Sequence, residues 1–161
     1  MPKRQWNPKL IGERAECAFI KAAFDHALIV SKPLWDSAPY DFIVQLRKPS
    51  NRRGRGDRGG YLYSIQVKAV SVLTRCGYVL STRRSLGHPY RRGDLDYFAG
   101  WIMPLDIWYI IPASEVIPAK AAALYPHKKR SRGKFEKFRE AWHLLSEPQV
   151  LTHCPPGRRL R

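Results

Sequence analysis

The amino-acid sequence predicts an α/β fold, with a central mixed sheet flanked by helices. Three observations predict this class. An apolar stripe of helical period lies near the N-terminus, several short segments alternate apolar with polar residues, and no repeat or linker divides the 161 residues. Hydrophobic residues make up 44% of the chain, which suffices for a packed core. We therefore expect a single domain over 1–161, with its core at about 10–146 and a basic, frayed tail over 148–161.

Two amphipathic helices are expected. In residues 11–28, Ile11, Ala15, Phe19 and Ala22 recur at three- and four-residue steps and form one apolar face. In residues 133–145 the inward positions of the predicted helix are Phe135, Phe138, Ala141, Trp142 and Leu145. A short helical piece is expected within 112–124.

Strands are predicted where side chains alternate or where apolar residues form short runs. The predicted strands cover 28–30, 40–47, 61–69, 77–82, 97–103 and 107–111. The arginine- and glycine-rich segment 51–60 is incompatible with a strand interior, so it is predicted to be the loop of a long hairpin. A Pro-Leu-Asp turn joins the last two strands into a second hairpin.

The charge of the chain indicates a polyanionic partner. Lys and Arg number 29 against 13 Asp and Glu, a formal net charge of +16. DNA, RNA and the ribosome fit this balance equally well. Three scattered cysteines indicate a reducing compartment, and neither a secretory signal nor a membrane-spanning segment is visible. A cytoplasmic protein with no membrane partner is expected.

Polar side chains on two neighbouring predicted strands form a candidate catalytic set. Gln66 and Lys68 are two residues apart and project from the same face, and a hairpin pairing brings Asp41 close to Gln66. A hard divalent cation takes oxygen ligands such as the Asp41 carboxylate, the Gln66 amide oxygen and the Val67 backbone carbonyl. Lys68 would orient water and stabilise negative charge on a phosphate. Hydrolysis of a phosphodiester bond needs such a set.

These motifs resemble the PD-(D/E)XK nuclease superfamily. The signature corresponds to Tyr40-Asp41 followed by Gln66-Val67-Lys68, and GERAE at 12–16 resembles the start of the family's first helix. The stretches GYVLSTRR, YRRGDLDYFAG and WYIIPASEV resemble one bacterial branch. That branch includes homing endonucleases encoded by cyanobacterial group I introns and is distantly similar to archaeal Holliday-junction resolvases.

The resemblance implies a restriction-endonuclease-like fold and a Mg²⁺-dependent endodeoxyribonuclease, with Mn²⁺ expected to substitute. It places Glu16 beside the site, where it would hold a metal-bound water or position a second ion. Two positions depart from the pattern. Tyr40 replaces the proline before Asp41, which is common in the family. Gln66 replaces an acidic residue, so the site has one negative charge fewer and is expected to bind metal less tightly.

Basic segments provide candidate DNA contacts. They are Arg52, Arg53, Arg55 and Arg58; Arg83, Arg84, Arg91 and Arg92; and Lys128, Lys129 and Arg130. Asp94 and Asp96 are interpreted as turn residues and not as metal ligands. No pair of histidines has the spacing of a zinc site.

Homing-type cleavage of double-stranded DNA is the first functional expectation. The alternatives are a nuclease resembling Holliday-junction resolvases and a non-catalytic DNA-binding protein with a nuclease fold. A basic RNA-binding protein would explain the charge but not the ordered set of Asp41, Gln66 and Lys68. Cutting two strands calls for two active sites, so a homo-oligomer, either a dimer or a tetramer, is expected.

Overall fold

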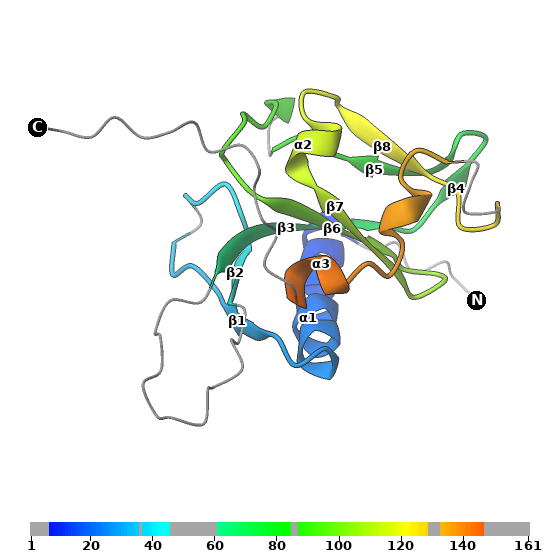
Figure 1. The fold of residues 1–161 in the computed structure, drawn as a ribbon. Helices are drawn as coiled ribbons and strands as arrows, with labels where there is room; N and C mark the ends of the chain where they lie inside the picture. The colour runs from blue at the N-terminus through cyan, green and yellow to red at the C-terminus, as the bar shows by residue number, and fades with distance from the viewer. Residues whose placement is uncertain (1–6, 36, 46–60, 85–86, 129–132, 147–161) are drawn as a thin grey trace, which may run out of the picture.

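The computed structural model describes residues 7–35, 37–45, 61–84, 87–128 and 133–146 (Figure 1). The helical elements are α1 (Pro8–Asp25), α2 (Ala113–Val116), the 3₁₀ turn η3 (Glu136–Phe138) and α3 (His143–Ser146). The strands are β1 (Ile29–Ser31), β2 (Phe42–Gln45), β3 (Leu62–Val70), β4 (Leu73–Thr74), β5 (Gly77–Ser81), β6 (Tyr97–Ile102), β7 (Ile107–Pro112) and β8 (Ala121–Leu124). No helix in these ranges is long and apolar enough to cross a membrane.

A five-stranded sheet with the order β1-β2-β3-β6-β7 forms the centre of the fold. β3 and β6 are parallel, and the other neighbouring strands are antiparallel. The predicted α/β class and mixed sheet are therefore confirmed, as are the β2–β3 and β6–β7 hairpins. Strands β4, β5 and β8 form a second, smaller sheet (Figure 1).

The two faces of the central sheet are covered differently. On one face the apolar stripe of α1 packs against β2 and β3, and Phe19, Phe42 and Ile65 are almost fully buried there. On the other face the small sheet contributes Leu80 and Leu124 to a second core. The short helical elements α2 and η3 also contribute to this second core, so the predicted flanking helices are present, and the small sheet is an addition that the sequence did not predict.

The first helix begins earlier and ends earlier than its apolar pattern predicts. The Asn7 side chain accepts a hydrogen bond from the backbone N–H of Lys9 at 3.0 Å, and Pro8 occupies the first turn. At the other end Ala27 adopts a positive φ of 55°, and the Leu28 N–H donates to the Ala23 carbonyl. This closure ends the helix and turns the chain into β1.

The predicted helix over 133–145 is wrong. Its inward residues are buried as expected, but the segment forms only η3 and α3, separated by extended and left-handed residues. Glu140 has a φ of 51°, and its N–H donates to the Trp108 carbonyl while its carboxylate accepts the Trp108 N–H. Arg139 also bridges to Tyr109. The segment thus satisfies backbone groups at the edge of β7, which a continuous helix would leave unpaired.

A buried carboxylate holds this segment to the second core. Glu136 is 1% exposed and accepts hydrogen bonds from the Tyr109 hydroxyl at 2.9 Å and the Tyr125 N–H at 2.7 Å. We predict that Glu136→Ala lowers the free energy of unfolding by about 3 kcal/mol, because buried donors lose their acceptor. Urea unfolding measures this change. The control is Glu115→Ala, which removes a surface ion pair with Lys137 and should change stability little; equal losses would contradict the prediction.

Candidate active site

The register of β2 against β3 determines where the polar side chains point. Phe42 pairs with Ile65, and both side chains enter the core beneath α1. Because side chains alternate along a strand, the flanking residues Asp41 and Gln66 lie on the opposite face. The Asp41 N–H donates to the Ile65 carbonyl at 2.9 Å, which continues the ladder one residue beyond β2.

The Asp41 carboxylate, the Gln66 amide and the Val67 peptide group meet where β3 runs past Asp41. The Gln66 Nε2 atom lies 2.5 Å from Asp41 Oδ2 and 3.4 Å from the Val67 carbonyl oxygen. The Val67 N–H donates to the same Asp41 oxygen at 2.8 Å. The structure therefore brings together Asp41, Gln66 and Val67, the three groups that the sequence predicts as metal ligands.

Lys68 completes the set on the same face of β3. Burial lowers its pKa from the ordinary value, and the negative charge of Asp41 opposes this shift. Burial likewise raises the pKa of Asp41, while the hydrogen bond from the Val67 N–H lowers this pKa. Of the nearby charges, that of Glu16 raises the pKa of Asp41 and that of Lys68 lowers it. Both charged groups are thus partly withdrawn from water and lie close enough for the charge of each to shift the pKa of the other.

Glu16 and Asp41 line a common depression of about 210 Å³. Its lining consists of Glu16, Lys32, Pro33, Trp35, Ala38, Tyr40 and Asp41. Glu16 Oε2 forms an ion pair with Lys32 Nζ at 2.6 Å. The predicted proximity of Glu16 to Asp41 is therefore present. Lys32 is an additional neighbour that sequence reasoning missed, because no motif or spacing connects it to Glu16.

Tyr90 is a second neighbour that sequence reasoning did not place at the site. Burial raises its pKa to about 12, and the nearby charge of Asp41 adds to this increase. The Arg84 guanidinium lies 6.0 Å from the centre of the Tyr90 ring and 3.8 Å from the Asp94 carboxylate. The basic loop that contains Arg84 therefore adjoins the catalytic candidates.

Of the predicted DNA contacts, some lie in the described residues and others outside them. Arg91, Arg92 and Lys128 are exposed, and Arg83 and Arg84 are partly exposed. Lys128 Nζ lies 4.2 Å from the centre of the Tyr125 ring, and the Arg83 guanidinium donates to the Gly87 carbonyl at 3.1 Å. Outside the described residues lie Arg52, Arg53, Arg55, Arg58, Lys129 and Arg130.

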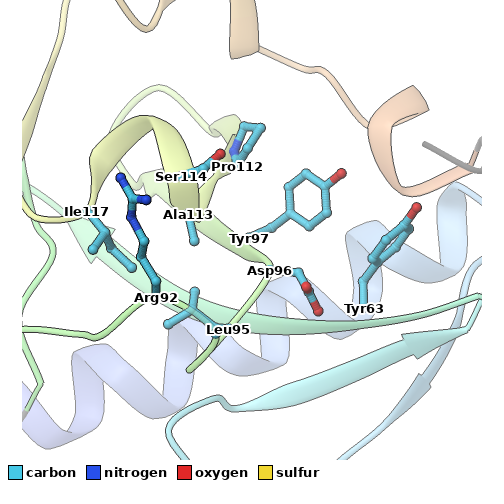
Figure 2. A pocket seen from close by; sticks show the side chains of 10 residues that line it. Tyr63, Arg92, Leu95, Asp96, Tyr97, Pro112, Ala113, Ser114 and Ile117 are labelled. Atoms are coloured by element: carbon cyan, nitrogen blue, oxygen red, sulfur yellow. The ribbon is translucent and has the colours of Figure 1, made fainter. Parts of the chain in front are cut away.

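Asp96 has the structural role that the sequence indicates. Its carboxylate accepts hydrogen bonds from the Ser64 N–H at 2.8 Å and the Ser64 hydroxyl at 2.7 Å, tying the start of β6 to β3. Asp96 also lines a separate depression of about 420 Å³. Figure 2 shows Asp96 with the rings of Tyr63 and Tyr97 on one side of it, and Arg92 and Ile117 on the other. None of the predicted catalytic residues lines this depression.

The donor set at Asp41 suits a hard divalent cation. In the structure the Gln66 nitrogen faces Asp41 and the Val67 carbonyl; a half-turn of the amide would exchange its nitrogen and oxygen, and a carboxylate, an amide oxygen and a backbone carbonyl would then face one point. Among the described residues no group of three or more His, Cys, Asp or Glu side chains could hold a metal ion. Of the three candidate ligands only the Asp41 carboxylate is charged, because Gln66 supplies an amide and Val67 a backbone carbonyl.

A carboxylate just before one strand, an amide and a lysine on the next, and a helix glutamate beside them match the arrangement that the sequence motif predicts for a PD-(D/E)XK nuclease. Residues 6–145 match the family of PD-(D/E)XK endonucleases, and the chain belongs to this family. Among solved structures it is similar to I-Ssp6803I, a bacterial homing endonuclease. The TM-score is 0.69 and the identity 29%, over 87% of this chain and 93% of that one. The restriction-endonuclease-like fold is confirmed. Comparison with curated proteins gave no match.

Restoring the acidic residue of the family motif is expected to make stability depend more strongly on metal. Gln66→Glu would place a second carboxylate beside Asp41 Oδ2, where two like charges repel without a cation. We predict that the melting temperature falls by roughly 2–4 °C in chelator, as expected for a loss of about 1 kcal/mol. Differential scanning fluorimetry should also show a larger rise with Mn²⁺ than in the wild type. A variant with unchanged melting temperatures in both solutions would contradict a metal site here.

Proposed function

We propose that this protein is a metal-dependent endonuclease that hydrolyses phosphodiester bonds of double-stranded DNA, as a homing-type enzyme does. The observation that carries the proposal is the meeting of Asp41, Gln66 and Val67 at one point, with Lys68 on the same face. Membership of a nuclease family and the likeness to a homing endonuclease support it. The net charge of +16 supports a nucleic-acid substrate.

Each residue has a defined task in this proposal. Asp41, the Gln66 amide oxygen and the Val67 carbonyl would hold Mg²⁺ or Mn²⁺, and the cation would polarise the scissile phosphate and make a water molecule more acidic. Lys68 would orient the attacking water and stabilise the charge that develops on the phosphate. Glu16, now paired with Lys32, would hold a further water or a second cation once Lys32 turned toward the DNA.

Cleavage of both strands is proposed to require two copies of the chain. One set of catalytic candidates is present in the described residues, and an antiparallel duplex presents two scissile phosphates. A homo-oligomer, either a dimer or a tetramer, would place one site on each strand. Light scattering tests this, and a monomer that stays monomeric on duplex DNA would contradict it.

The proposal is tested by a cleavage panel. Purified protein is incubated with supercoiled plasmid, a four-way DNA junction and structured RNA, each in Mg²⁺, Mn²⁺ and chelator. The expected result is metal-dependent cutting of duplex DNA. Selective cutting of the junction would indicate a resolvase, and binding without cutting in every metal would indicate a non-catalytic DNA-binding protein. Preferential action on RNA would overturn DNA as the substrate.

A further inference from the structure

Two large apolar side chains next to the candidate active site are exposed to solvent. Trp35 is 74% exposed and Leu34 is 85% exposed. By contrast, the three tryptophans in and near the sheet are 5%, 5% and 3% exposed; they are Trp101, Trp108 and Trp142. Tryptophan is highly buried on average in folded proteins, and adjacent exposed apolar residues mark a contact surface more often than isolated ones do.

The position of Trp35 ties it to the chemistry. It lines the same depression as Glu16 and Asp41. The chain that carries it links β1 to β2, and the pairing of Ser31 with Ile43 fixes one end of this connection on the sheet. The other end leads directly into Asp41. A ring held in this connection lies beside whichever part of a substrate reaches the Asp41 carboxylate.

The depression suits one part of a long ligand better than a whole small molecule. Its volume of about 210 Å³ is below the roughly 300–1,000 Å³ typical of small-molecule sites. Lys32, which borders it, supplies a positive charge near its acidic residues. An aromatic ring next to a cation and a phosphate-cleaving centre matches the way nucleic-acid-binding proteins combine base stacking with backbone contacts.

We propose that Trp35 forms a nucleobase subsite, in which its indole ring stacks on a base of the nucleotide that flanks the scissile phosphate. Leu34 beside it adds apolar contact to the same nucleotide. Stacking there positions the phosphate over Asp41 and Lys68, and it favours a base step that can open toward the protein. This inference rests on the proposed function, since it places the scissile phosphate at Asp41.

Tryptophan fluorescence tests the contact without requiring cleavage. Trp6 lies outside the described residues, so it is replaced by phenylalanine in the protein used. Emission and its quenching by acrylamide are then recorded in chelator, with and without a 30-base-pair duplex at low ionic strength. The same titration is made with Trp35→Phe added. We expect the duplex to shield a quenchable emission that Trp35→Phe lacks. An emission component of Trp35 that stays equally quenchable at saturating duplex would overturn the proposal.

Plasmid cleavage in Mn²⁺ tests the positioning role. Trp35→Ala is expected to lower the initial rate about tenfold, within the range that a base–aromatic stack contributes, and Trp35→Phe should retain most of the rate. The control is Phe24→Ala, which removes a ring that is 79% exposed on α1 and should leave the rate unchanged. Equal rates for Trp35→Ala and wild type would overturn the subsite. If the wild type cuts no DNA, the proposed function fails, and the fluorescence result alone decides whether Trp35 contacts DNA.

Discussion

Lys68→Met is expected to lower metal-dependent DNA cleavage about a hundredfold or more, the loss typical of removing a positioned stabilising group. The Lys68 ammonium is partly buried and lies near Asp41, so water screens its charge less than it screens a fully exposed lysine. Methionine keeps the unbranched apolar stem and removes the charge. The measurement is the initial rate of plasmid cleavage in Mn²⁺.

The control for this substitution is Lys21→Met. The Lys21 side chain is 82% exposed and pairs with Asp25 at 3.0 Å on α1, so this variant removes the same charge without touching the site. It should cleave at the wild-type rate. If both lysine variants lost activity equally, Lys68 would contribute only general attraction for DNA.

Lys68→Met is also expected to raise the melting temperature at neutral pH, by about 2 °C. Burial lowers the folded-state pKa of Lys68 below 10.5. Because the folded-state pKa is lower than the unfolded-state pKa, burying the neutral Lys68 amine costs less than burying the charged one. This contribution to stability is fully present above the unfolded pKa and is lost as the pH falls through the folded pKa. The wild type therefore bears the cost of the charged amine at neutral pH, and the difference from the variant should narrow as the pH rises toward 10.5.

Asp41→Asn is the second substitution with a large expected effect, again a hundredfold or greater loss of cleavage. Asparagine retains an oxygen that can accept the Val67 N–H, so the β2–β3 connection should survive. What it removes is the negative charge among the candidate metal ligands. Burial raises the pKa of Asp41, so the substitution also relieves a desolvation cost and should leave the melting temperature in chelator equal to or above that of the wild type.

Metal provides a readout for Asp41→Asn that is independent of cleavage. A ligand that binds the folded state alone raises its stability, so Mn²⁺ should raise the melting temperature of the wild type but not that of the variant. The control is Asp25→Asn, which alters a carboxylate that is 57% exposed and pairs with Lys21. An equal Mn²⁺ effect in wild type and Asp41→Asn would place the cation elsewhere.

Local alternation explains why the central hairpin could be predicted from the sequence. Phe42 and Val44 in one strand, and Tyr63 and Ile65 in the next, have period-two burial that is visible in the residues themselves. β8 could not be found this way. Its sequence AAAL has no polar alternation and favours a helix, and it becomes a strand because it pairs with β5, whose paired residues lie 40 to 46 positions earlier.

At the candidate active site, too, residues placed by local strand geometry could be predicted, and residues placed by distant packing could not. Asp41, Gln66 and Lys68 follow from strand geometry and the family motif, and the structure brings the first two into direct contact. Lys32 and Tyr90 depend on packing between segments distant in the chain, for which the sequence contains no periodic signal. The break in the last helix at Glu140 also depends on a distant partner, the edge of β7.

The most direct measurement of the central claim is plasmid cleavage by four purified proteins: wild type, Asp41→Asn, Lys68→Met and Lys21→Met. Each is first shown by thermal unfolding to be folded, and each is assayed in Mn²⁺ and in chelator. The claim predicts that the wild type and Lys21→Met cut only in Mn²⁺, and that neither site variant cuts at a comparable rate. Cleavage by Asp41→Asn and Lys68→Met at the wild-type rate would contradict it.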